Sequence, residues 1–242
     1  MSSDKTGLGD RMKGQYEVRA QTLLPRRTYT IIRLDGKAFH TYTRGCEKPY
    51  DRELSVGMQS AAGLLCKEAQ GARFAYVQSD EISVLLTDFA TDHTDAWFDG
   101  NVQKIVSVAA SIVTAHFNSL RREKGLAYFD ARVFTIPDPT EVKNYFVWRQ
   151  RDGIRNSIMS LAQAHFSHKQ LHGKNTDELQ EMLWSEKRIN WAAENSVFKN
   201  GALVTRTTLN RNGATRSQWD GMRSPVFSQD MTVLDGLVPE YD

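Results

Sequence analysis

Between residues 28 and 136 the chain alternates between two kinds of apolar pattern, and their order constrains the fold more than any other feature. Short runs of β-branched, aliphatic and aromatic residues predict four strands, at 28–34, 74–77, 82–86 and 131–136. Apolar residues at three- and four-residue spacing predict a helix that Asp51 caps and a second helix over 97–120. The resulting order, βαββαβ, is that of the ferredoxin-like split βαβ fold, which belongs to the α+β class.

The remaining segments predict additions to this unit. A short helix is expected over 11–23, a long helical region over 140–172 with Gly153 as a candidate break, and a helix over 175–191 with Thr176 as candidate cap. Strand-like residues at 202–209 and 214–218 flank Asn212-Gly213, a strong hairpin-turn signal. The tail after Val226 is expected on the surface. We therefore expect a catalytic domain over 1–137 and, over 138–242, a helical and hairpin extension packed on it.

Composition excludes several classes of protein. The chain lacks a run of about 18 apolar residues, so we expect no transmembrane helix, and its polar start lacks an apolar signal core. A cytoplasmic protein without membrane contact is the default. Two cysteines without CxxC spacing do not make a disulfide framework or a zinc site. No phosphate-binding GxxxxGK[ST] loop and no GxSxG nucleophile motif occurs in the sequence.

Two acidic stretches interrupt the predicted strands. Asp35-Gly36 ends the first apolar run, and Ser79-Asp80-Glu81 separates the second from the third. In the split βαβ fold the first strand lies beside the third, so these acids should meet at one edge of the sheet. A carboxylate at such a place needs a cation or hydrogen bonds to stay charged.

Paired carboxylates suit Mg²⁺, which prefers oxygen ligands and keeps waters for phosphates. Asp35 and Asp80 are therefore candidate ligands of two Mg²⁺ ions, which can activate a hydroxyl and stabilise leaving pyrophosphate. Gly36 could add its carbonyl, because no side chain shields it. The alternative is that Asp35 caps a turn and Asp80 belongs to a polar hairpin. His165, His168 and His172 also share helical spacing, but without a fourth ligand we interpret them as surface residues.

Other residues are candidates for phosphate or RNA contact. The stretch from Lys37 to His40 would lie over a triphosphate, with Phe39 either stacked on a base or packed inside, and Lys48 and Lys104 could contact phosphates. The net charge of +2 is uninformative, but residues 187–223 hold seven basic and two acidic residues, a local charge of +5. Such a segment suits an RNA backbone or forms a solvated surface.

An ordered set of motifs resembles the tRNA(His) guanylyltransferase superfamily over roughly residues 10–205. The motifs are Arg33-Leu34-Asp35-Gly36-Lys37-Ala38-Phe39-His40, Lys48-Pro49-Tyr50-Asp51, Gln78-Ser79-Asp80-Glu81, Phe129-Asp130-Ala131-Arg132 and Trp148-Arg149-Gln150, with weaker similarity around Asn190 and Lys199-Asn200-Gly201. Members have a polymerase-like palm and add nucleotides to the 5′ end of tRNA in the 3′-to-5′ direction.

The resemblance implies roles for these residues. Asp35, the Gly36 carbonyl and Asp80 look like the ligands of two Mg²⁺ ions, and Glu81 like their acidic neighbour in catalysis. The nucleotide, GTP or ATP or another nucleoside triphosphate, would be bound by the following residues: Asp35, Gly36, Lys37, Ala38, Phe39, His40, Lys48, Asp51, Ser79, Asp80 and Lys104. Family members are commonly homotetramers.

One departure from the family pattern is informative. After Trp148-Arg149-Gln150, eukaryotic members carry His-Ile-Asn-Asn-Leu-Tyr-Asn, whereas this chain reads Ile154-Arg155-Asn156-Ser157-Ile158-Met159-Ser160. The chain thus resembles the bacterial and archaeal branch, which implies template-dependent 5′-end repair, with G−1 addition to tRNA(His) as the open alternative, and a preference for 5′-triphosphorylated or adenylylated ends. We assign tRNA binding to Arg155, Asn156, Lys199, Arg206, Arg211 and Arg216.

Two other functions fit parts of the pattern. A nucleotide cyclase can use a related palm with paired acids, and would form a cyclic product from GTP alone. A non-catalytic RNA-binding module could use the same sheet, although such modules stack bases on sheet-face aromatics. Here acids mark the functional edge instead.

Overall fold

A computed structural model of the chain describes residues 7–211 and 214–241, without side chains at 209–211 and 214. Within these residues six strands form one antiparallel sheet, in the order β4-β1-β3-β2-β5-β6. The strands are β1 (Tyr29–Gly36), β2 (Ala72–Gln78), β3 (Glu81–Thr87), β4 (Phe129–Ile136), β5 (Ala202–Arg211) and β6 (Ala214–Arg223). The α+β class is confirmed, and β4-β1-β3-β2 is the expected split βαβ order.

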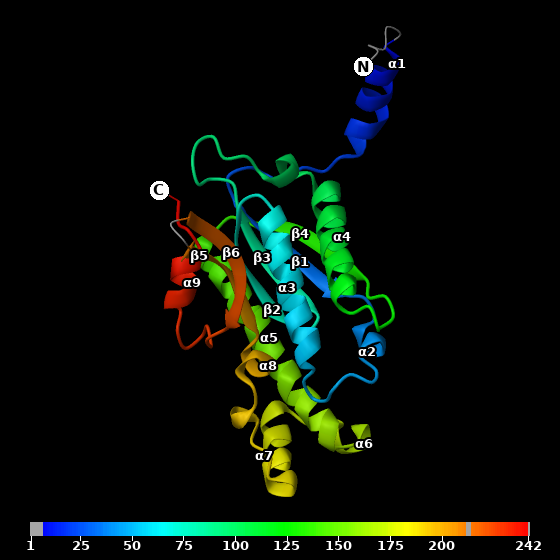
Figure 1. Cartoon of the computed structure of the whole chain (residues 1–242), viewed down its shortest axis with the longest axis vertical. Helices are drawn as coiled ribbons and strands as arrows, with labels where there is room; N and C mark the ends of the chain where they lie inside the picture. Colours follow the sequence, from blue (N-terminus) through cyan, green and yellow to red (C-terminus); the bar gives the residue numbers. More distant parts are fainter. Residues whose placement is uncertain (1–6, 212–213, 242) are drawn as a thin grey trace.

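Helices cover both faces of this sheet (Figure 1). The helices α3 (Arg52–Glu68) and α4 (Val102–Leu120) lie side by side on one face, and the long helix α5 (Pro139–His165) crosses the other. Of the shorter helices that follow, α6 (His168–Leu171) lies at the end of α5, α7 (Thr176–Lys187) beside its distal half, and α8 (Ser196–Asn200) beside its middle. Shorter elements are α2 (Phe39–Tyr42), η3 (Trp97–Gly100), η4 (Trp191–Ala193) and α9 (Thr232–Leu237).

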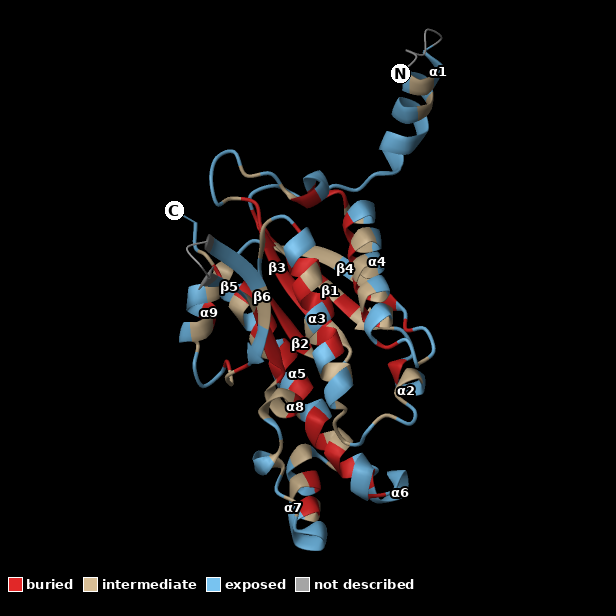
Figure 2. Cartoon of the chain, in the orientation of Figure 1, coloured by how far each residue is buried: buried red, intermediate tan, exposed pale blue. Residues whose placement is uncertain are grey.

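The central strands of the sheet are largely buried (Figure 2), and alternation along them divides their side chains between the two faces. Ile32, Leu34, Ile82 and Val84 join the core under α3 and α4, whereas the odd-numbered Ile31 and Leu85 are among the core residues that face α5. Since neighbouring residues of a strand point to opposite faces, Arg33, Asp35, Glu81 and Ser83 belong to the α5 face. The buried faces of the strands thus determine on which side the charged residues lie.

The C-terminal segment is more buried than the sequence suggested. Phe227, Leu234 and Val238 are each at most 1% exposed and pack with the core on the α5 side, so the surface prediction for the tail is wrong at these three positions, although residues such as 228–230, 235 and 236 are exposed. Side-chain hydrogen bonds from Gln150 explain the attachment: its amide donates to the carbonyl of Pro225, and its carbonyl accepts from the amide of Phe227.

Several boundaries also differ from expectation. The N-terminal helix begins at Leu8 and continues through η1 (Lys13–Glu17) and η2 (Val18–Ala20), and it projects away from the body (Figure 1). The cap of α7 is Asn175 rather than Thr176, since its side chain accepts from the amides of Asp177 and Glu178. The hairpin of β5 and β6 forms as expected, but Asn212-Gly213 lies outside the described residues. No helix among residues 7–211 and 214–241 has the length and apolar character to cross a membrane.

Helix α5 runs through Gly153 without a break, and the contacts of this glycine give the reason. A Cβ at Gly153 would lie 2.6 Å from Cγ of Gln78, so glycine lets the helix approach β2 closely. The side-chain amide of Gln78 donates from Nε2 to the backbone carbonyls of Gly153, at 3.4 Å, and of Phe198, at 2.9 Å. The glycine therefore serves as a packing residue between helix and sheet.

We expect Gly153→Ala to destabilise the protein by about 1–3 kcal/mol, because the added methyl must displace Gln78 and its hydrogen bonds. Urea unfolding at constant pH measures this change. Gly236→Ala is the matched control, since it lies in helix α9 with no atom within 4 Å of the added Cβ. It should be neutral or slightly stabilising through helix propensity. Equal stability of the two variants would contradict the packing role.

Candidate active site

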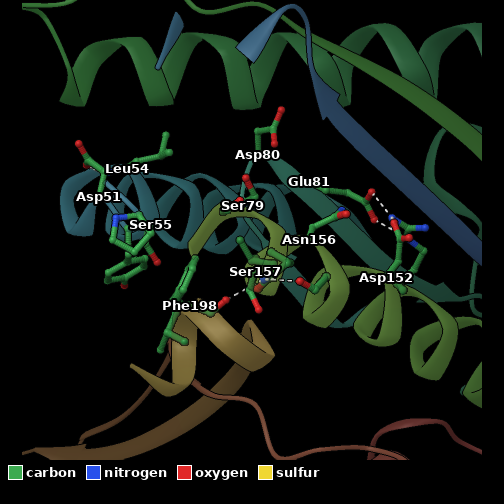
Figure 3. A pocket seen from close by; sticks show the side chains of 18 of the residues that line it. Asp51, Leu54, Ser55, Ser79, Asp80, Glu81, Asp152, Asn156, Ser157 and Phe198 are labelled. Atoms are coloured by element: carbon green, nitrogen blue, oxygen red, sulfur yellow. Dashed lines mark hydrogen bonds and ion pairs between the residues drawn. The ribbon is translucent and has the colours of Figure 1, made fainter. Parts of the chain in front are cut away.

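A cavity of about 310 Å³ opens where β1, the β2–β3 turn, the start of α3 and the middle of α5 meet (Figure 3). Polar and charged side chains dominate its wall. From the sheet come Arg33, Asp35, Gln78, Ser79, Asp80 and Glu81; from around α3 Tyr50, Asp51 and Ser55; from α5 Arg149, Asp152, Asn156, Ser157 and Ser160; and from α8 Phe198. A pocket of this size with converging polar groups is a candidate binding site.

The acidic stretches meet as predicted. Asp35 lies opposite Glu81 in the register of β1 and β3, and Ser79 and Asp80 form the two-residue turn between β2 and β3. Ser79 has a φ of 54°, and such positive φ angles are typical of the turns in two-residue hairpins. The strands extend further than predicted, so Asp35 and Glu81 lie within strands instead of following them. Asp35 and Asp80 line the same cavity.

Asp80 occupies an unfavourable place for a negative charge. Burial raises the pKa of its carboxyl, and the nearby charges of Asp35 and Glu81 raise it further, against hydrogen bonds from its own amide and from Ser79. A raised pKa means that the folded protein disfavours the charged form. A cation at this edge would relieve the repulsion.

Glu81 differs from the other two acids because arginines hold it on both sides. Arg149 donates from Nε and Nη2 to its two carboxylate oxygens, each at 2.7 Å, and Arg33 donates from Nη2 at 2.6 Å. In Figure 3 the Glu81 side chain points toward this ion-pair group, and that of Asp80 points in another direction. Arg33 also lies 3.9 Å from Asp35, so it connects both acids.

Asp51 has a structural role in the cavity wall. Its carboxylate caps α3 by accepting from the amide of Leu54 at 2.7 Å, and Arg121 lies 3.4 Å away. Burial works to raise the pKa of Asp51, but the hydrogen bonds from Leu54 and Glu47 and the charge of Arg121 lower it overall. Asp51 is therefore a carboxylate fixed in place at the mouth of the cavity.

The residues that follow β1 lie at the same end of the sheet but outside the cavity wall. The amide of Lys37 donates to the carbonyl of Tyr128, and Lys37, Ala38 and His40 are exposed. Phe39 is only 5% exposed, and its ring packs on aromatic core residues instead of being available to a base. A Cβ at Gly36 would lie 2.2 Å from this ring, which explains the glycine independently of any metal.

Lys48 and Lys104 are not part of the cavity wall. Lys48 is exposed in the loop before α3. Lys104 lies in the first turn of α4, at the end of the sheet where β3 finishes, so the length of the sheet separates it from Asp80 (Figure 1). The structure therefore does not bring Lys104 to the two aspartates.

The candidate RNA-binding residues divide into two groups. Asn156 lines the cavity, and Arg155 beside it is exposed and paired with Asp152. Lys199 donates to the carbonyl of Ala192. Arg206 and Arg216 are exposed on the β5–β6 hairpin, which leads away from the cavity because β5 begins beside the end of β2. Arg211 ends β5, but its side chain lies outside the described residues.

Sequence patterns missed the arginines of this site. Arg33 and Arg149 stand inside two of the motifs quoted above, and their position beside acidic residues of the site became visible only in the fold.

No group of three or more His, Cys, Asp or Glu side chains suited to a metal occurs in the described part of the chain, and this includes the three histidines near α6. Any metal here would need backbone or substrate oxygens besides Asp35 and Asp80.

We expect Asp80→Asn to stabilise the metal-free protein at neutral pH. The folded pKa of Asp80 lies above its unfolded value, so the carboxyl contributes stability below the unfolded pKa and loses it as the pH rises through the folded pKa. The asparagine amide of the variant carries no charge at any pH, so the variant avoids this loss of stability. Thermal unfolding should show a higher Tm for the variant at pH 7, with a shift of about 2–4 °C for each kcal/mol.

The difference should vanish near pH 3, where the wild-type carboxyl is protonated in both states. Added Mg²⁺ should stabilise the wild type and leave Asp80→Asn largely unchanged. A lower Tm for the variant at every pH would contradict the account of Asp80 as a strained charge.

Comparison with known proteins gives a consistent picture. A family model described as "Thg1: tRNAHis guanylyltransferase" matches residues 9–137. A tRNA(His) guanylyltransferase from Eremothecium gossypii is 30% identical over 214 residues, which span 79% of this chain and 87% of the relative.

Two solved structures match nearly the whole fold. A bacterial tRNA(His) guanylyltransferase (Thg1)-like protein in complex with ATP superposes with a TM-score of 0.88 at 41% identity, covering 96% of this chain and 99% of the other. A bacterial Thg1-like protein in complex with GTP has a TM-score of 0.84 at 39% identity, with the same coverage. The Saccharomyces cerevisiae enzyme reaches 0.69 at 26% identity over 86% of this chain and 95% of its own.

Proposed function

Because the chain belongs to the tRNA(His) guanylyltransferase family and is a nucleotidyltransferase of that family, we propose that it adds nucleotides to the 5′ end of a tRNA. Addition proceeds in the 3′-to-5′ direction, is directed by the opposite strand, and releases pyrophosphate. The observation that carries the proposal is the meeting of Asp35 and Asp80 in one cavity at the edge of a sheet with palm-like strand order.

The donor set fits Mg²⁺. Asp35 and Asp80 supply carboxylate oxygens, the carbonyl of Gly36 is a third candidate, and burial beside other acids leaves Asp80 a carboxylate that a cation would stabilise. Two Mg²⁺ ions held there would polarise phosphate oxygens and lower the pKa of an attacking hydroxyl. Glu81 acts indirectly in this arrangement: its ion pairs with Arg33 and Arg149 fix the start of β3 and hence the turn that carries Asp80.

The substrates are nucleoside triphosphates, including ATP and GTP, as the bound ligands of the two bacterial neighbours suggest. Ser79 and Asp51, with Asn156 across the cavity, lie where they could contact one nucleotide. The exposed residues Lys37 and His40, at the same end of the sheet, could contact another nucleotide or its phosphates. The family also suggests a homotetramer, in which a tRNA could reach the basic hairpin of one subunit and the cavity of another.

One assay separates the proposed reaction from its alternatives. The protein is incubated with Mg²⁺ and labelled GTP, with and without a tRNA that lacks its first 5′ nucleotide. The proposal expects label in the RNA, lengthened by one nucleotide, and none without RNA. A cyclic nucleotide formed from GTP alone would instead indicate a cyclase, and RNA binding without incorporation a non-catalytic module.

A further inference from the structure

A second hollow, of about 240 Å³, lies beside α7 and has no part in the proposed reaction. Its wall combines two indole rings, two primary amides and one aliphatic side chain, from Trp184, Trp191, Gln180, Asn190 and Ile189. Trp184 is 51% exposed, which is unusual for so large an apolar ring. Flat aromatic surfaces beside amide donors and acceptors are the groups that proteins use to stack and read unpaired bases.

Cations lie over both rings. The guanidinium carbon of Arg188 is 5.9 Å from the centroid of Trp184, and Nζ of Lys199 is 5.4 Å from that of Trp191. A base stacked on either indole would bring its phosphate near a positive charge, and such contacts supply much of the affinity for RNA. The volume is below that of pockets for drug-sized molecules, so it suits a single ring system.

A single hydrogen bond links the wall of the hollow to the wall of the catalytic cavity. Nε1 of Trp191 donates to Oγ of Ser157 at 3.1 Å, and Ser157 lines that cavity. Helix α7 packs beside the distal half of α5 (Figure 1). RNA whose 5′ end lies in the cavity therefore has its nearest unpaired nucleotides within reach of the two tryptophans.

We propose that this hollow binds an unpaired base from the single-stranded 3′ tail of the same tRNA whose 5′ end is extended. The inference rests on the proposed function, because it needs the tRNA end in the cavity. In a tRNA the 3′ tail continues the strand that pairs with the 5′ end, so both ends leave the duplex together. Stacking would hold the acceptor end in place while a nucleotide is added.

The test compares two substrates: a 5′-truncated tRNA with its 3′ tail, and the same RNA with the tail removed. For the wild type we expect the tail to lower the KM for RNA about tenfold, the typical effect of stacking one base. Trp184→Ala should lose this advantage, raising KM for the tailed substrate only and leaving kcat unchanged. Trp184→Phe should keep most of the lower KM that the tail gives, because phenylalanine still offers a ring for stacking. Met222→Ala, which replaces an exposed apolar residue on β6, should keep it as well.

Other outcomes overturn the inference. An unchanged KM in Trp184→Ala, or an equal rise on both substrates, would mean that Trp184 does not bind the tail. If Trp184→Ala changes the oligomeric mass of the protein, the hollow is instead part of a contact between copies of the chain. If the wild type adds no nucleotide to either RNA, the proposed function fails instead. A single-stranded tetranucleotide should still quench the tryptophan fluorescence of the wild type, and should quench that of Trp184→Ala much less at the same concentration, because the alanine variant loses a stacking ring of the hollow. Equal quenching of the two proteins, or none in the wild type, would end the inference as well.

Discussion

We expect Asp35→Asn and Asp80→Asn each to lower the rate of nucleotide addition by a factor of about 10³ or more, while the protein stays folded. The proposed metals depend on both carboxylates, and a bound Mg²⁺ contributes several kcal/mol to charge stabilisation, where each 1.4 kcal/mol is about tenfold in rate. Both residues line the cavity, so either amide removes charge from the same place. The measurement is single-turnover extension of a 5′-truncated tRNA under saturating nucleotide.

Asp130→Asn is the matched control for these variants. Asp130 is the neighbour of Asp35 on β4, opposite it in register, but its side chain is 59% exposed and it is not part of the cavity wall. We expect its activity to stay within about twofold of the wild type, because exposed charges of this kind contribute little. Full activity of Asp35→Asn or Asp80→Asn would remove the metal assignment.

Arg149→Ala should destabilise the protein by about 1–3 kcal/mol, less than the cost of a buried charge with no partner, because Glu81 keeps its ion pair with Arg33. Arg149 and Glu81 are 7% and 14% exposed, and two hydrogen bonds join them. Without Arg149, Glu81 keeps the hydrogen bond from Arg33 and a longer one, of 3.5 Å, from the hydroxyl of Ser83. Chemical unfolding measures the change, and nucleotide addition should fall with it because the turn that carries Asp80 loses its support.

A matched arginine on the same helix provides the control. Asp152 forms ion pairs with both Arg149, at 3.0 Å, and Arg155. Because Arg155 is 67% exposed, Arg155→Ala should cost less than about 1 kcal/mol of stability. The double variant Glu81→Ala with Arg149→Ala should be less destabilised than the sum of the single changes, since the two residues interact. Additive effects would show that the ion pair does not couple helix to sheet.

Local patterns predicted the sheet well because each strand has a clear apolar run and each run ends at a distinct break. The order of those runs was sufficient to place Asp35 beside Glu81, as the register confirms. Strand ends were less predictable. Asp35 and Gly36 are polar or small, yet pairing with β3 and β4 holds them in the strand.

Contacts between distant segments could not be read from the sequence. Gly153 looked like a helix break, but it is a point of close approach to Gln78. The sequence left open whether Phe39 stacks on a base or packs inside, and the structure shows that it packs, because Gly36 leaves room for its ring in the core. The role of Arg149 could not be read from its motif, since it depends on the partly buried carboxylate of Glu81, 68 residues away.

The most direct test of the account is which nucleotide is added to a 5′-truncated tRNA when the opposing base is changed. We expect each template base to select its complement and Asp80→Asn to add no nucleotide. We also expect 5′-triphosphorylated RNA to be extended faster than 5′-monophosphorylated RNA, as the resemblance implies from Ile154 at the position of the motif histidine. Addition of the same nucleotide whatever the opposing base, or undiminished addition by Asp80→Asn, would contradict the account.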